Sequence, residues 1–99
     1  MTTDISSETL NALLREFELP DTTKFSGYVI HLPDEEEFLH SIVEAQDKTV
    51  RKFCDSPEHA KTYNTKLSAS KDAEKCKQRT DICYLLELDN QLMITPVDL

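Results

Sequence analysis

The sequence has one glycine, no tryptophan and no long apolar segment. A nucleotide-binding loop needs several glycines, so the lone Gly27 excludes a glycine-rich phosphate cradle. No apolar run approaches the ~20 residues that a membrane-spanning helix needs. The first ten residues also lack the basic and apolar regions of a secretion signal. Without internal repeats or Gly- or Pro-rich linkers, we expect residues 1–99 to form one domain with a core of mainly Leu, Ile, Val and Phe.

Cysteine is scarce, and its number is odd. Three cysteines cannot all pair within the chain, so Cys54, Cys76 and Cys83 are expected as free thiols in the cytoplasm. Zinc binding by these thiols together with His59 is disfavoured, because their spacings match no close-paired zinc pattern. We therefore expect no metal and no cofactor.

The first third of the chain predicts one helix and one strand. Ser6 suits a helix N-cap, and apolar residues recur at helical spacing from Leu10 to Phe17, before Pro20. Residues 24–32 are rich in strand formers and apolar on both faces. That pattern predicts a strand in the centre of a sheet.

Residues 34–37 place four acids directly before an apolar segment. Asp34 suits an N-cap, Glu37 stands three positions later, and acids favour the positive end of a helix dipole. We therefore predict a helix from residue 34 to about 54, with the apolar stripe Phe38, Leu39, Ile42, Val43, Val50 and Phe53. Ser56 and Pro57 predict a further short helix that ends near Leu67. Residues 68–80 are expected as a polar loop or a mobile helical extension.

The C-terminal residues 82–96 predict a β-hairpin. A three-residue loop at 88–90 is favoured, because it keeps the more apolar residues of both strands on one face of the hairpin. A two-residue turn at Asp89 and Asn90 would place residues of the two faces opposite each other. In the favoured register Ile82, Tyr84 and Leu86 oppose Pro96, Ile94 and Leu92. The order α-β-α-α-β-β predicts an α+β domain, with helices packed on one face of a small, mostly antiparallel sheet that ends in this hairpin.

Bases are few, and they are concentrated in one segment. The chain has 19 acids and 11 bases, a net charge of −8. Residues 1–47 hold 11 acids and 2 bases, residues 48–79 hold 9 bases and 4 acids, and residues 80–99 hold 4 acids. The acidity disfavours binding to nucleic acid or to anionic membrane. The segregation is either a solvated face or an electrostatic surface that orients a partner.

No set of residues points to catalysis, so we predict that the chain is not an enzyme. A cysteine nucleophile with His31, His40 or His59 as its base has no supporting local pattern. Acids at the start of a helix in water also lack the burial that would separate their pKa values for acid–base work.

We hypothesise a non-catalytic acidic protein that binds a basic surface of another protein. Its sharpest form is an inhibitor that mimics nucleic acid, because carboxylates spaced along a helix can stand in for phosphates. Small antagonists of nuclease-based defence and small immunity or antitoxin proteins share this size and acidity. The predicted binding residues are Asp34, Glu35, Glu36, Glu37 and Glu44.

Two alternative functions stay open. The chain could be an accessory or regulatory subunit that binds through an apolar hairpin or helix surface. Nucleic acid could instead bind to the basic segment 48–79, although the acidic remainder of the chain would repel a polyanion within a Debye length or two.

Overall fold

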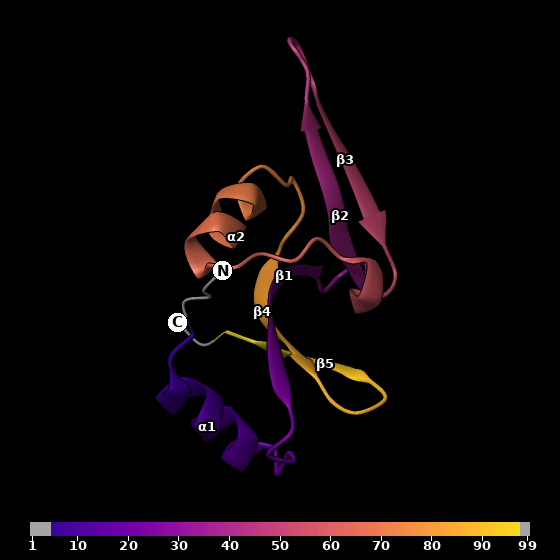
Figure 1. The fold of residues 1–99 in the computed structure, drawn as a ribbon. Helices are drawn as coiled ribbons and strands as arrows, with labels where there is room; N and C mark the ends of the chain where they lie inside the picture. The colour runs from indigo at the N-terminus through magenta and orange to yellow at the C-terminus, as the bar shows by residue number, and fades with distance from the viewer. Residues whose placement is uncertain (1–4, 98–99) are drawn as a thin grey trace.

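The computed structural model describes residues 5–97, which form two α-helices, one 3-10 turn and five β-strands (Figure 1). The strands make one antiparallel sheet in the order β3-β2-β1-β4-β5, so the predicted α+β class is confirmed. In chain order the elements are α1 (Ser7–Glu16), β1 (Lys24–Leu32), β2 (Glu37–Glu44), β3 (Thr49–Cys54), η1 (Pro57–His59), α2 (Lys66–Ala73), β4 (Asp81–Glu87) and β5 (Leu92–Pro96).

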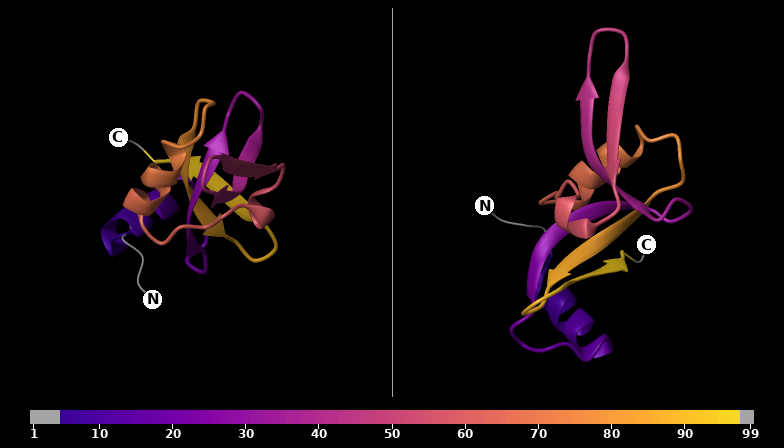
Figure 2. Two further views of the ribbon diagram at one scale, coloured as in Figure 1. Left: turned by 90° about the horizontal axis from the view of Figure 1, so that it is seen from above. Right: turned by 90° about the vertical axis from the view of Figure 1, so that its right-hand side faces the viewer.

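Strand β1 lies in the centre of the sheet, as predicted, and Val29, Ile30 and Leu32 on it are fully buried. It pairs with β4 along almost its whole length but with β2 through only two residue pairs. Strands β2 and β3 therefore extend beyond β1 and project from the body as an arm, residues 40–52 (Figures 1 and 2). The molecule is elongated as a result, at 46 × 24 × 24 Å.

The helix predicted over residues 34–54 is wrong, because this segment forms β2 and β3. A β-bulge at His40 explains the error. The extra residue places Leu39 and Ile42, three positions apart, against the same core cluster. A bulged strand thus reproduces the spacing of a helical stripe, while Phe38 packs on the opposite side of the sheet.

A second bulge has the same effect in β1. The register shifts between Phe25 and Gly27, so Phe25 lies on the face of Tyr28, with their ring centroids 5.2 Å apart. Simple alternation along this strand would have placed the two rings on opposite faces.

The segment after β3 also differs from the prediction. Ser56 caps a turn as expected, but this turn is the short 3-10 element η1 and not a helix that continues toward Leu67. Residues 60–64 then run extended as a strap, and the Tyr63 backbone exchanges two 2.8 Å hydrogen bonds with Tyr28. Helix α2 begins after its N-cap Thr65, where the predicted short helix was expected to end. It runs to Ala73, within the segment expected as a polar loop or a mobile helical extension.

The C-terminal hairpin is present, but its predicted register is wrong by one residue. Leu85 pairs with Ile94, and the Leu88 N–H donates to the Gln91 carbonyl at 2.9 Å, which leaves Asp89 and Asn90 as a two-residue turn. Strand β4 has neighbours on both sides and buried residues on both faces. Because neither face of β4 is exposed to solvent, the alternation of polar and apolar residues could not select the register of the hairpin.

Two core clusters lie on opposite faces of the sheet. One contains Tyr28, Ile30, Leu39, Tyr63 and Ala69, and the helix α2 covers it through Ala69. The partly buried Tyr84 packs against this same cluster, and Leu13 of α1 lines one surface hollow together with Tyr84. The opposite cluster contains Val29, Phe38, Cys83 and Leu85. Within residues 5–97, no helix is long and apolar enough to cross a membrane.

Candidate functional site

The five acids predicted as a binding surface do not form one cluster. Residues 34–36 form an exposed turn between β1 and β2, and Glu37 begins β2, where it pairs with Leu32. Glu44 ends β2, seven residues further on, which at ~3.3 Å per residue places it roughly 23 Å from Glu37. The acidic turn, residues 34–36, and Glu44 are therefore separate features.

The acidic turn presents two carboxylates that make no ion pair with the described residues. Asp34 lies 3.6 Å from the Arg79 guanidinium, but both side chains are 66% exposed, so this ion pair contributes little. Glu35 and Glu36 are exposed and make no ion pair within residues 5–97. Glu36 also has a φ of 56°, the left-handed conformation that favours glycine.

Glu44 belongs instead to a charged network that fastens the arm to α2. Its carboxylate lies 2.6 Å from the Lys75 ammonium, which is 3.7 Å from the Asp72 carboxylate. Lys61 of the strap lies 3.0 Å from Asp72, and the Tyr63 hydroxyl donates to Asp72 at 2.5 Å. No sequence pattern indicates this network, because its members come from β2, the strap and the polar segment that holds α2.

Burial and hydrogen bonding fix the charges within this network. Burial and the bond to Asp72 raise the pKa of Tyr63 well above its usual value, so the phenol stays a neutral donor. Burial alone would raise the pKa of Asp72, but hydrogen bonds from Tyr63 and Lys61, with the charges of Lys61 and Lys75, lower it below its usual value. Tyr63 is therefore neutral and Asp72 charged near neutral pH.

The three cysteines are free thiols. Burial raises the pKa of the fully buried Cys83 to about 11, and burial also raises the pKa of Cys76. Cys54 lies near the carbonyl oxygens of Phe38 and Ser56, at 3.6 and 3.4 Å. In the described part of the chain, no group of three or more His, Cys, Asp and Glu is placed to hold a metal ion.

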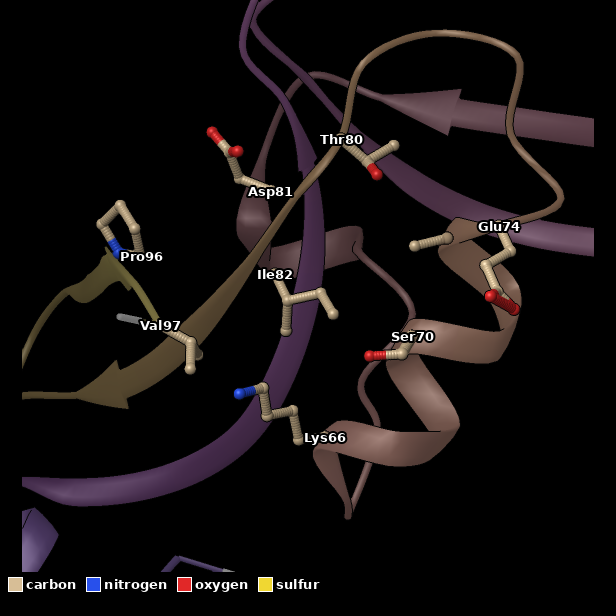
Figure 3. Close-up of a pocket in the computed structure, with 9 residues that line it drawn as sticks. Lys66, Ser70, Glu74, Thr80, Asp81, Ile82, Pro96 and Val97 are labelled. Atoms are coloured by element: carbon tan, nitrogen blue, oxygen red, sulfur yellow. The ribbon is translucent and has the colours of Figure 1, made fainter. Parts of the chain in front are cut away.

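Several hollows mark the surface of the body. One, of about 280 Å³, lies between α2 and the adjoining ends of β4 and β5 (Figure 3). It mixes the charges of Lys66, Glu74 and Asp81 with an apolar part from Ile82 and Val97. This mixed lining selects no ligand class.

The second hollow is an acidic groove between η1 and the β4–β5 turn. It has a volume of about 580 Å³, and its lining includes the carboxylates of Glu58, Glu87 and Asp89 but no basic residue. Sequence reasoning missed the groove because about thirty residues separate Glu58 from the other two acids.

The arm carries the most exposed valines of the chain's described part. Val43 and Val50 pair across β2 and β3 and are 56% and 40% exposed. Lys48 and Lys52 flank them and are exposed. Sequence reasoning assigned both valines to a buried helical stripe and so missed this surface.

Comparison with models of known protein families, with curated proteins and with solved structures found no match to this chain.

Proposed function

We propose that this chain is a non-catalytic interaction protein that binds a basic surface of another protein through the acidic turn, with Glu35 and Glu36 making the contacts. One observation carries the proposal: both carboxylates are exposed and make no ion pair within residues 5–97, and Glu36 holds a left-handed backbone. A strained residue in an exposed turn points to a role outside folding. Carboxylates at such a surface steer and orient a cationic partner.

A protein that binds nucleic acid is one instance of such a partner, because its groove is basic. The helix that would have spaced the carboxylates like phosphates is absent, since residues 37–44 are a strand. Mimicry of nucleic acid therefore depends only on where the carboxylates lie on the surface, and not on a helix that spaces them. The acidic groove supplies a further set of carboxylates, at Glu58, Glu87 and Asp89.

The second candidate function, an accessory subunit that binds through apolar contacts, is favoured by the exposed Val43 and Val50 on the arm. Binding of nucleic acid to residues 48–79 has less support. Lys61, Lys75 and Arg79 of that segment face carboxylates of the same molecule. Those carboxylates offset part of the positive charge that a phosphate backbone would need.

Replacing Glu35 and Glu36 together by Gln tests the acidic turn, since shape is kept while two charges are lost. Each exposed contact contributes roughly 0.2–1 kcal/mol, so we expect association with a partner isolated at low salt to slow about 2- to 30-fold. The matched control is Glu8→Gln with Glu16→Gln, which removes two exposed charges from α1. Wild-type association rates in the Glu35/Glu36 variant, measured at low and high salt, would refute the proposal.

Glu36→Gly separates folding from binding at the same position. Glycine relieves the left-handed backbone, so we expect the free energy of unfolding to rise by about 1 kcal/mol. Binding should weaken at the same time, because a carboxylate is lost. A variant that is more stable and binds normally would show that Glu36 is only a turn residue.

A further inference from the structure

Strand β3 forms one edge of the sheet, and its outer side has no strand beside it in the described part of the chain. The arm closes with a 2.8 Å hydrogen bond from the Ala45 N–H to the Lys48 carbonyl. Antiparallel alternation then bonds Val50 to Val43, and it turns the backbone N–H and C=O groups of Thr49 and Arg51 outward. An exposed row of such groups is a template for one more strand.

The charge on this edge has one sign. Lys48 and Lys52 are exposed without an ion pair within residues 5–97, and β3 itself contains no acid. The Arg51 guanidinium is held in place, because its Nε–H donates to the Lys75 carbonyl at 2.5 Å. The edge therefore offers bases at 48 and 52 on the same face as Val50.

This pattern disfavours a second copy of the chain that pairs through the centre of β3. If two β3 strands paired about a two-fold axis through Val50, Lys48 would lie opposite Lys52 of the second copy. Centring the pair on Arg51 or on Lys52 would also place like charges directly opposite each other, which destabilises a sheet. An acidic strand would instead place a carboxylate opposite each of these basic residues, which stabilises the pairing.

We propose that the β3 edge binds an extended acidic segment of another protein, which adds to the sheet as a sixth, antiparallel strand. Side chains that alternate along such a strand share one face. The segment should therefore carry an acid opposite Lys52, an apolar residue opposite Val50 and an acid opposite Lys48. Main-chain bonds to Thr49 and Arg51 supply affinity, and the two acids supply specificity. This site is distinct from the acidic turn and selects the opposite charge.

The probe is the capped heptapeptide Thr-Glu-Thr-Val-Thr-Glu-Thr, and its charge-reversed control has Lys for Glu. Titration into the full chain should slow amide hydrogen exchange at Thr49 and Arg51, and only the acidic peptide should bind. Lys48→Glu with Lys52→Glu should weaken acidic-peptide binding at least about fourfold at low salt and favour the lysine peptide. Lys71→Glu with Lys77→Glu is the matched control, which should change binding less than about twofold.

N-methylation of the third and fifth peptide residues tests the strand pairing without altering the protein. These amides would face Arg51 and Thr49, so methylation should abolish binding. Binding that survives methylation would refute a sixth strand and leave only surface attraction. Absence of acidic-peptide binding would overturn the proposal. The proposal would also be overturned if the wild-type chain formed a concentration-dependent dimer in sedimentation and its β3 amides were protected from hydrogen exchange without peptide.

Discussion

Gly27→Ala should strongly destabilise the protein, because the one glycine of the chain lies where the strap crosses β1. Gly27 has a φ of 136°, which L side chains rarely adopt. A Cβ atom built there would lie 2.5 Å from Cγ2 of Thr62 and 2.7 Å from the carbonyl oxygen of Tyr63. The Tyr63 backbone is itself bonded to Tyr28 on both its N–H and its C=O, so it cannot move away freely.

The magnitude follows from two costs and one gain. Overpacking against a fixed backbone costs about 1–3 kcal/mol, and holding alanine at this φ costs about 1–3 kcal/mol more. Alanine also restricts the unfolded chain, which returns about 0.4–1 kcal/mol. The net loss is roughly 1–5 kcal/mol, a large share of the 5–15 kcal/mol typical of a domain. Each kcal/mol corresponds to a fall in Tm of about 4–8 °C at this size.

Urea unfolding followed by far-UV circular dichroism measures this loss, since the chain has no tryptophan to report by fluorescence. Thr62→Ser supplies the second arm of a double-mutant cycle, because it removes Cγ2 and keeps the hydroxyl that donates to the Ala60 carbonyl. The combined variant should recover the part of the loss due to Thr62 and not the part due to Tyr63. A Gly27→Ala variant within about 0.5 kcal/mol of wild type would refute this account of the strap.

Three further predictions concern the folded state. Glu18 has a φ of 52° at the end of α1, so Glu18→Gly should raise the free energy of urea unfolding by about 1 kcal/mol; no gain would contradict the assigned strain. Asp72→Asn should cost about 1.5–3 kcal/mol at pH 7. Because the pKa of Asp72 is lowered in the folded state, its carboxylate stabilises the fold at pH values above the unfolded pKa of about 3.9. This stabilisation is lost as the pH falls through the folded pKa, so wild type and variant should approach the same free energy of unfolding in acid. The Cys83 thiol should react with a thiol reagent only after unfolding, and its raised pKa should lower stability as the pH rises from 9 toward 11; rapid reaction in the native state would contradict its burial.

Local signals were sufficient where an element is determined by its own residues. The Ser6 side chain accepts from the Thr9 N–H and begins α1 where the sequence predicts it. The strand over residues 24–32 has the predicted bounds, because it is apolar on both faces. The C-terminal hairpin was also predictable as an element.

Other elements depend on contacts that no local pattern records. The bulges at His40 and near Gly27 gave strands the spacing of helices. Helix α2 buries only Ala69, so it has almost no apolar stripe to detect, and its Asp72 is held by Tyr63 from the strap. The predicted binding residues are also distributed differently, since Glu44 was expected on the same helix as Glu37 and lies at the far end of strand β2.

The segregation of charge along the chain becomes an arrangement of separate surfaces in the fold. Lys75 and Arg79 return from the basic segment to meet Glu44 and Asp34, so part of each charge run is neutralised internally. Within residues 5–97, Glu35 and Glu36 at the base of the arm and Lys48 and Lys52 along its edge make no ion pair. Salt would weaken binding at either surface, because exposed contacts of both signs are screened alike. Salt dependence can therefore distinguish electrostatic from apolar binding, but it cannot tell which surface is used. The substitutions at Glu35 and Glu36 and those at Lys48 and Lys52 are needed together, since each pair should weaken binding only to a partner of the opposite charge.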